Sequence, residues 1–328
     1  RSQLPRVRPH LQAMKKPSVV SLFAGCGGSS AGYKMAGCSV KMAVEWEEIP
    51  VASYRRNFPR AKVHHGDVCD VTGDLVMEQT GLKKGELDLL DASPPCQGFS
   101  TSGLRHLHDP RNQLFREFVR LLEDLQPRSM VMENVAGLTK GKMKAVLAEM
   151  LAEMDRVGYN TKTAVLKSSW YGVPQARDRL IVTGTRKDLD CLPVLPKPRT
   201  APVSARAALR GVDNKTFHPG LSPSLLACWQ LSEANNKSPD DPRLGGRWFN
   251  FVRLDPDQPA PTLITDPKIT HWDQPRLLTI EEAKRLQSFP DNFELVGTYG
   301  QQWKQIGNSV PPLLTKAIAE DLLKVLPR

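Results

Sequence analysis

The sequence predicts an α/β protein in which helices cover both faces of a parallel sheet, together with a smaller irregular domain. Three observations support this fold class. Short apolar runs that suit buried strands alternate with helical stretches through residues 18–185. Polar or special residues, among them Gly25, Glu45, Asp67 and Glu133, directly follow several of these runs. Finally, 13 of the 27 prolines lie between residues 191 and 275, where the alternation is lost.

The elements follow from local patterns. Strands are predicted where apolar runs end at glycine or polar residues, at 18–23, 40–44, 63–65, 87–92, 129–132 and 180–183. Helices are predicted at 29–35, 115–125 and 142–157, ending near Gly37, Pro127 and Gly158. A capping box of Thr279 and Glu282 begins a helix to about residue 288, and a last helix covers 311–326. Ligands of such sheets bind at the carboxyl ends of the strands, so we expect the active site there.

The domain organisation is predicted from the change in composition. We expect a basic N-terminal tail at 1–17, a catalytic domain built from 18–185 and 259–328, and a second domain at 186–258. The tail has five Lys or Arg residues, no acid and no apolar core segment, which excludes a secretory signal. It starts with Arg, which indicates that something precedes it in the natural chain.

Composition narrows the functional classes. The chain has 328 residues, a formal charge of +10 and 40% apolar residues, which excludes a disordered protein. No apolar run is long enough to span a membrane. The six scattered cysteines form no Cys-x-x-Cys pair, so we expect no metal and an intracellular location, cytoplasmic in a bacterium or nuclear in a eukaryote. The basic excess favours a polyanionic partner.

A first group of residues has the chemistry of a nucleoside site. Glycines at 25, 27 and 28 lie between a strand and a helix, without the spacing of a dinucleotide site. Glu45 suits the two hydroxyls of a ribose, Trp46 can stack on a base, and Asp67 can accept from an adenine amine. Ribose and adenine without pyrophosphate indicate S-adenosylmethionine as the cofactor. A tight turn and a solvated acid are the alternative explanation.

A second group supports covalent chemistry on a ring. Two prolines stiffen the backbone before Cys96, which lies in a polar loop that suits a nucleophile better than a buried structural thiol. Glu133 follows a strand and can protonate a ring nitrogen, or it can be a helix cap. Gln175, Arg177 and Arg179 alternate along an extended segment and share one face. A surface charge run is the alternative there.

Together these motifs resemble the bacterial-type C5-cytosine DNA methyltransferases. Phe-x-Gly-x-Gly-Gly, Pro-Pro-Cys-Gln-x-Phe-Ser, Glu-Asn-Val, Gln-x-Arg-x-Arg, a block from Arg276 to Pro290 and Gly-Asn-Ser-Val occur in the family's order. The resemblance covers about 18–185 and 255–310. It implies a Rossmann-like, S-adenosylmethionine-dependent methyltransferase sheet with a smaller, irregular target-recognition domain.

The resemblance also implies roles for individual residues. The cofactor site would contain Phe23, Ala24, Gly25, Gly27, Gly28, Glu45, Trp46, Asp67, Val68, Pro95, Leu114, Asn308 and Ser309. The catalytic set would be Cys96 as nucleophile, Glu133 at N3 and the exocyclic amine of cytosine, Arg177 at the O2 side, and Arg179. The loop 99–111 would close over double-stranded DNA, with contacts from Gln97, Ser100, Arg105 and Gln175. Pro110 and Asn112 depart from the small residue and glycine that many members carry, which would stiffen this loop.

The chemistry explains this combination. Attack of the Cys96 thiolate at C6 breaks the aromaticity of cytosine, Glu133 assists at N3, and C5 then accepts a methyl group. A stacked base cannot reach such a site, so the cytosine must be flipped out of the duplex. The main alternative substrate is tRNA on the same core, although the Cys-Phe-Thr tripeptide of that branch is missing. A catalytically dead regulator and a thiol hydrolase are further alternatives.

Sequence recognition is expected from the second domain, in a protein that acts as a monomer. Residues 186–258 contain 11 Lys and Arg and 8 Asp and Glu. Arg243, Arg247 and Arg253 flank aromatic residues at 248, 249 and 251, and we expect base contacts from these arginines. A small core with solubilising arginines is the alternative. The recognised DNA sequence cannot be derived from these residues.

Overall fold

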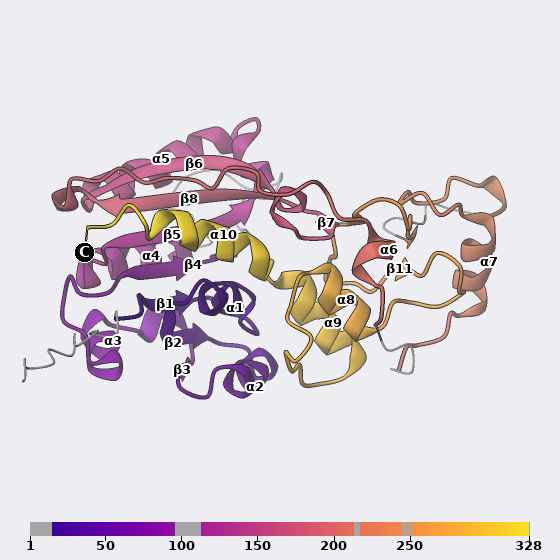
Figure 1. Ribbon diagram of the computed structural model, residues 1–328, viewed down its shortest axis with the longest axis horizontal. Helices are drawn as coiled ribbons and strands as arrows, with labels where there is room; N and C mark the ends of the chain where they lie inside the picture. The colour runs from indigo at the N-terminus through magenta and orange to yellow at the C-terminus, as the bar shows by residue number, and fades with distance from the viewer. Residues whose placement is uncertain (1–14, 96–112, 213–216, 245–247, 249–250, 328) are drawn as a thin grey trace, which may run out of the picture.

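A seven-stranded mixed sheet forms the centre of the protein (Figure 1). The computed structural model describes residues 15–95, 113–212, 217–244, 248 and 251–327. The strands lie in the order β3-β2-β1-β4-β5-β8-β6. Their bounds are β1 Ser18–Leu22, β2 Ser39–Glu45, β3 Lys62–His65, β4 Leu89–Ala92, β5 Ser129–Val135, β6 Tyr159–Lys167 and β8 Asp178–Arg186.

Strand direction differs from the prediction at one edge of the sheet. The five strands from β3 to β5 are parallel, as expected, but β8 runs antiparallel to both β5 and β6. The sequence analysis missed β6, because its first half, Tyr-Asn-Thr-Lys-Thr, is not an apolar run. β6 is the edge strand, and an edge strand needs few apolar residues because its outer side faces solvent.

Helices cover both faces of the sheet, and adjacent strand residues point to opposite faces. Val20, Leu90 and Val182 pack on one side into a core with α3 Gly73–Thr80, α4 Gln113–Leu125 and α5 Met143–Arg156. Their neighbours Val19, Leu89 and Ile181 pack on the other side with α1 Gly28–Met35 and α10 Pro312–Leu322. This two-sided burial explains why these strands are continuously apolar in the sequence.

A third core joins the recognition segment, defined here as residues 186–258, to the C-terminal part of the chain. Val252 and Leu254 pack there with Leu263, Leu286 and Trp303. Figure 1 shows this part beyond one end of the sheet, with α8 and α9 between the sheet and α7. Its elements are α6 Ala205–Ala208, α7 Pro223–Leu231, β9 Val252–Arg253, β10 Ala260–Pro261, β11 Ile269–Thr270, α8 Ile280–Leu286 and α9 Tyr299–Asn308, and β10 pairs with β7 Gln175–Ala176.

The predicted helices are present with small differences in length. The capping box of α8 is confirmed, since Thr279 and Glu282 each bond the other's backbone N–H. The sequence did not predict α2 Glu48–Asn57, α3, α6, α7 or α9. Glycine lies at the start of α3 and within α9, and α2 contains proline, so local patterns did not identify these three. Among the described helices, none is long and apolar enough to cross a membrane.

Candidate active site

The loop after β1 has an unusual backbone. Phe23, Gly25 and Gly27 all have positive φ, at 55°, 55° and 102°. Positive φ is easy for glycine but strained for phenylalanine, and such strain concentrates at functional sites. The Ala24 N–H donates to the carbonyl of Val44 at 3.0 Å, which attaches the loop to the end of β2. The predicted glycine site is therefore a strained turn held against the neighbouring strand.

The same loop contacts a segment 283 residues further along the chain. A Cβ atom on Gly28 would lie 2.6 Å from the carbonyl oxygen of Val310, so only glycine allows this approach. The Sγ of Cys26 lies 3.3 Å from the Oγ of Ser309, and both residues are buried. Asn308 is exposed beside them. The fold thus brings together the two ends of the predicted cofactor site.

Glu45, at the end of β2, orders this loop directly. Its carboxylate accepts from the backbone N–H groups of Gly25 at 2.7 Å, Trp46 at 2.9 Å and Glu47 at 2.8 Å. Burial raises the pKa of Glu45, and the three N–H bonds oppose that rise. A carboxylate has about four acceptor positions, so it retains capacity for a further donor. The neighbouring Trp46 side chain is 71% exposed and available for stacking.

Asp67 follows β3 at the same edge. Its Oδ1 accepts from the Cys69 N–H at 2.9 Å, which lowers the pKa of Asp67. Val68 next to it is buried in the core under the sheet. Arg120 from α4 donates to the carbonyl of Val71 at 2.7 Å and holds this turn in place. The exposed carboxylate is consequently fixed at its predicted position relative to β3.

The loop after β4 is described only up to Pro95, which is exposed. Leu114 begins the next described segment and is half-buried against the core. Four predicted site residues lie outside the described residues: Cys96, Gln97, Ser100 and Arg105.

Glu133 forms an ion pair with Arg179. The Arg179 Nε lies 2.8 Å from the Glu133 Oε1, and both side chains are mostly buried. The prediction placed Glu133 after its strand, but β5 continues to Val135 because β8 pairs with it. The adjacent Asn134 donates its side-chain N–H to the carbonyl of Pro94 at 3.3 Å. Glu133 therefore lies beside the chain that leads to residue 96.

Gln175 and Arg177 make hydrogen bonds within the protein. Gln175 is fully buried, donates to Gln287 and accepts from the N–H of Leu263 at 3.0 Å, and its expected contact with DNA stays a prediction. Arg177 was expected at the O2 side of the base. Its guanidinium instead donates to the carbonyls of Leu263 at 3.0 Å and Gly307 at 2.9 Å. Gln175 and Arg177 thus bond to distant backbone segments inside the protein, whereas Arg179 pairs with Glu133.

Comparison with known proteins decides the family. The sequence profile of C-5 cytosine-specific DNA methylases matches residues 18–237 and 229–324. The chain belongs to this family. The family description names DNA, which supports the DNA substrate over the tRNA alternative. This DNA methylase is 35% identical to the type II methyltransferase M.XorII of Xanthomonas oryzae pv. oryzae, over 95% of this chain and 86% of the relative. It is 34% identical to M1.HphI of Haemophilus parahaemolyticus, over 93% and 86%.

Solved structures agree with this assignment. A protein of Escherichia coli, described as a DNA modification methyltransferase encoded within a prophage, superposes with a TM-score of 0.78 and 26% identity, over 94% of this chain and 99% of that one. DNMT2 of Spodoptera frugiperda superposes with a TM-score of 0.68 over 94% and 99%, and at 20% identity this similarity concerns the fold. The DNA methylase thus has the predicted methyltransferase fold.

The predicted base-reading arginines of the methylase have different environments. Arg253 donates to the carbonyls of Trp272 at 2.8 Å and Ser232 at 2.9 Å, and its guanidinium lies 3.9 Å from the ring centroid of Trp229. These contacts engage Arg253 with Ser232 in the recognition segment and with Trp272 beyond it, and the expected base contact of Arg253 stays a prediction. The sequence could not show this, because its partners lie some 20 residues away on either side.

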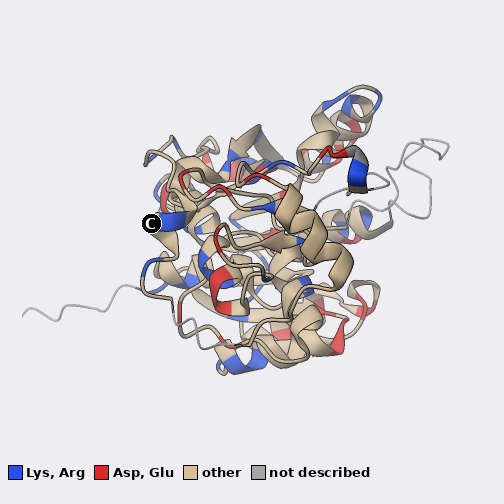
Figure 2. Ribbon diagram, turned by 90° about the vertical axis from the view of Figure 1, so that its right-hand side faces the viewer, with Lys and Arg blue, Asp and Glu red and all other residues tan. Residues whose placement is uncertain are grey.

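Arg243 remains available at the surface. The Arg243 side chain is 70% exposed and forms an ion pair with Asp241. Hydrogen bonds from Arg243 lower the pKa of Asp241 to about 2. Arg247 lies outside the described residues. Figure 2 shows basic and acidic residues interspersed at this end of the methylase. Mixed charges are consistent with local contacts by single arginines rather than with a uniformly basic surface.

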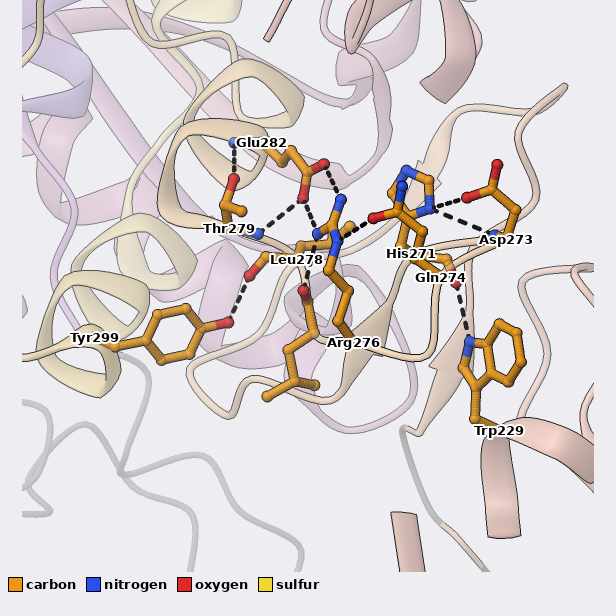
Figure 3. Close-up of polar contacts among 10 residues, drawn as sticks. Trp229, His271, Asp273, Gln274, Arg276, Leu278, Thr279, Glu282 and Tyr299 are labelled. Carbon is orange, nitrogen blue, oxygen red and sulfur yellow. Dashed lines mark hydrogen bonds and ion pairs between the residues drawn. The ribbon is translucent and has the colours of Figure 1, made fainter. Parts of the chain in front are cut away.

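A buried polar network joins the recognition segment to α8 (Figure 3). Arg276 makes two bonds to Glu282, at 2.7 and 2.8 Å, with both side chains buried. The Arg276 carbonyl accepts from the N–H of His271, whose own carbonyl accepts from the Trp229 indole at 3.0 Å. The methylase therefore anchors α7 through backbone bonds that end at a buried ion pair.

Asp91 was missed by the sequence analysis. This buried carboxylate on β4 accepts from Ser21 at 2.8 Å, Ser29 at 2.7 Å and Tyr33 at 2.7 Å. An acid within an apolar run was the available signal, because such an acid needs buried donors. Within the described residues of the methylase, no three His, Cys, Asp or Glu side chains are grouped to hold a metal ion.

Proposed function

We propose that this DNA methylase transfers the methyl group of S-adenosylmethionine to C5 of a cytosine flipped out of double-stranded DNA, through a covalent bond between Cys96 and C6. The observation that carries the proposal is the arrangement at one edge of the sheet. There, Glu133 lies beside the chain leading to Cys96, on the same side as the glycine loop and Glu45.

The residues present fit this cofactor. Gly28 makes room for a close backbone approach, Glu45 is buried with acceptor capacity left, and Trp46 presents an exposed ring. We propose that Glu45 accepts from the ribose hydroxyls, Trp46 stacks on the adenine and Asp67 accepts from its amine. Phe23, Pro95, Leu114, Asn308 and Ser309 would complete the site. When bound, the cofactor supplies an electrophilic methyl group on a sulfonium.

The protein would activate the cytosine in one covalent cycle. The Cys96 thiolate forms a bond to C6, and Glu133 accepts from the exocyclic amine and shares a proton at N3, so the ring electrons move towards C5. After C5 has gained its methyl group, a water molecule or another base takes the C5 proton. The C5–H electron pair re-forms the C5–C6 double bond, and the C6–S pair leaves with the Cys96 thiolate.

The arginine beside the base is assigned to Arg179. Its ion pair with Glu133 positions the carboxyl group, and a guanidinium has five N–H donors, so others are left for a carbonyl oxygen. Arg179 rather than Arg177 is therefore proposed to face the O2 side of the cytosine. Positioned donors of this kind stabilise charge that develops in the transition state.

The remaining parts have supporting roles in this proposal. Residues 186–258 read the target sequence, with Arg243 and Arg247 as candidates, and residues 1–17 bind phosphates. We also propose that the methylase works as a monomer, and that it acts in the cytoplasm of a bacterial cell, a location that its bacterial relatives favour. Each of these assignments is open to the experiments below.

The direct test is bisulfite sequencing of a plasmid in a host without cytosine methylation that expresses the protein. We expect methylation at C5 within one short sequence context. A purified enzyme with a duplex carrying 5-fluorocytosine in that context should form a covalent complex that survives denaturation, because fluorine cannot leave as a proton does.

The matched variants are Cys96→Ser and Cys191→Ser. An alcohol is a far weaker nucleophile than a thiolate, so Cys96→Ser should lose turnover and the covalent complex while still binding cofactor and DNA. Cys191 is a free cysteine far from the motif, and its variant should behave as the wild type. Retained turnover in Cys96→Ser would remove the nucleophile assignment.

A further inference from the structure

The chain that leads into β8 and the chain that returns from the recognition segment lie side by side. β7 directly precedes β8, β10 follows the recognition segment, and β7 and β10 pair in parallel with Ala260 opposite Gln175. The Thr262 hydroxyl also donates to the carbonyl of Ala176 at 2.7 Å. This junction fixes the return of the chain from the recognition segment against the start of β8.

One residue at the junction is held on both of its backbone groups. The N–H of Leu263 donates to the Gln175 side chain, and its carbonyl accepts from Arg177, each at 3.0 Å. Leu263 is fully buried. Two side chains from the start of the chain into β8 thus hold a buried residue of the chain that returns from the recognition segment.

The same two side chains reach the segment that lines the cofactor site. Arg177 donates to the carbonyl of Gly307 at 2.9 Å. Gln175 donates to Gln287, which in turn donates to the carbonyl of Ser309 at 2.6 Å. A Cβ on Gly307 would lie 2.5 Å from the carbonyl oxygen of Ile264, so the two backbones touch there. The junction forms one buried unit with Gly307 and Ser309.

Burying the Arg177 side chain costs more free energy than burying an apolar side chain would. Arg177 is 3% exposed, its Nε has no hydrogen-bond partner among the described residues, and it bonds only to carbonyls. Burial and the neighbouring Arg179 lower the pKa of Arg177 to about 9, against the attraction of Glu133. Burying a charge without a bonded carboxylate costs stability that an apolar side chain would not. What the guanidinium adds is two charge-assisted bonds with fixed geometry.

We propose that Arg177 and Gln175 are positioning residues that couple the recognition segment to the cofactor-lining residues 307–309, so that each of cofactor and target DNA binds more tightly when the other is present. The coupling is reciprocal, because it is a property of the equilibrium between the two sites. The inference rests on the proposed function for the identity of the two ligands. It assigns to Gln-x-Arg a connection between them rather than a contact with either.

Fluorescence anisotropy measures the dissociation constant of a DNA duplex that contains the sequence context found by bisulfite sequencing. The measurement is made with and without saturating S-adenosylhomocysteine. In the wild type the product should tighten DNA binding by at least about fivefold, a usual size for coupling between two sites. In Arg177→Met and in Gln287→Met the factor should fall below about twofold. Arg177→Lys keeps the charge and can reach one carbonyl, so it should give an intermediate factor.

Controls separate coupling from damage. Arg156→Met makes the same exchange at an exposed arginine of α5 and should keep the wild-type factor. If a residue had only a structural role, its loss would weaken the binding of DNA and of S-adenosylhomocysteine alike. The factor by which S-adenosylhomocysteine tightens DNA binding would then stay unchanged. The proposal is overturned if S-adenosylhomocysteine does not tighten DNA binding in the wild type, or if Gln287→Met keeps the wild-type factor. If Arg177→Met does not fold, the result for Gln287→Met decides. A wild type that binds no S-adenosylhomocysteine and methylates no DNA contradicts the proposed function instead.

Discussion

The Glu45 carboxylate accepts hydrogen bonds from nearby backbone N–H groups, and we propose that it also binds the cofactor. Three N–H groups around it use most of its acceptor capacity, and this fixes the turn that contains Gly25. A carboxylate that arranges a loop and still faces the site is preorganised for a ligand with hydroxyl groups. At the residue scale, binding and local structure are therefore linked in one side chain.

Replacing Glu45 tests that link. Glu45→Ala should weaken S-adenosylmethionine binding by about ten- to a hundredfold, since loss of a charged hydrogen-bond partner costs about 1.5–3 kcal/mol. Titration calorimetry measures the affinity. Glu47→Ala removes a neighbouring acid whose carboxylate pairs with Lys304, and it should bind nearly as the wild type does. Equal dissociation constants for the wild type and Glu45→Ala would show that Glu45 is not a ligand.

Asp91 predicts a pH dependence of stability. Burial raises the pKa of Asp91 to about 6, against the bonds from its three hydroxyl donors. A pKa raised above the unfolded value gives stability that is complete below about pH 4 and is lost as the pH rises through about 6. The free energy of unfolding in the wild type should contain this contribution, which Asp91→Asn lacks.

The comparison of wild type and Asp91→Asn isolates the effect. The variant places an amide donor among hydroxyl donors and should be less stable by about 1–3 kcal/mol at pH 7. Its deficit should be larger at pH 4.5 by about 2 kcal/mol, because only the wild type gains a proton there. Urea unfolding at both pH values measures the two deficits. A deficit of the same size at both would mean that Asp91 does not titrate in this range.

At the element scale, the start of α8 depends on the ion pair between Arg276 and Glu282. Glu282 caps the helix through the Thr279 N–H at 2.8 Å and also binds Arg276 (Figure 3). Because Arg276 also accepts from His271, the start of α8 and the loop before it form a single unit. Removing one partner would leave the other charge buried and unpaired.

The ion pair can be tested by single and double substitutions. Glu282→Ala should destabilise the protein by about 3–5 kcal/mol, because Arg276 remains buried without its partner. The double variant Arg276→Leu with Glu282→Leu should be clearly more stable than either single variant, since no charge stays unpaired. Thermal or urea unfolding measures the series. Additive losses in the double variant would show that the two side chains do not depend on one another.

Within the recognition segment, two arginines should separate structure from recognition. Arg253→Ala should lower the melting temperature, because it removes two hydrogen bonds and a contact with the Trp229 ring. Arg243→Ala should leave the melting temperature unchanged but reduce discrimination, since a bidentate contact to guanine provides about 1–3 kcal/mol. Methylation rates on the preferred site and on sites altered at one base pair measure discrimination. An Arg243→Ala variant with full discrimination would place base reading elsewhere.

For the whole molecule, the uneven distribution of charge suggests a division of labour. Much of the +10 charge lies outside the recognition segment, and five basic residues lie in the tail 1–17. Phosphate contacts add affinity without sequence information, whereas base contacts specify the target. Affinity and specificity should then respond to different truncations.

Deletion of residues 1–17 tests this division. Each phosphate contact contributes about 0.9 to the slope of log affinity against log salt concentration, so the slope should decrease by up to about 4.5. The methylated sequence should stay the same. Anisotropy over a range of salt concentrations and bisulfite sequencing provide the two readouts. An unchanged slope would mean that the tail does not contact DNA, and a changed target sequence would contradict the division.

The sequence by itself determined the parallel half of the sheet and the motifs that lie near the ends of its strands. Continuous apolar runs reveal strands buried on both faces, and Glu133, Glu45 and the glycine loop belong to short local patterns. A polar edge strand such as β6 has no comparable signal. The order of the motifs along the chain was enough to indicate the family.

The tertiary structure alone decided which polar side chains serve the site and which serve the fold. Gln175, Arg177 and Arg253 have the composition of ligand-binding residues, yet their partners are carbonyls, amides and rings from distant segments. Arg179, two residues beyond Arg177, instead pairs with Glu133. A guanidinium donates equally well to a phosphate, a base or a backbone carbonyl, so only the packing of distant segments determines its partner.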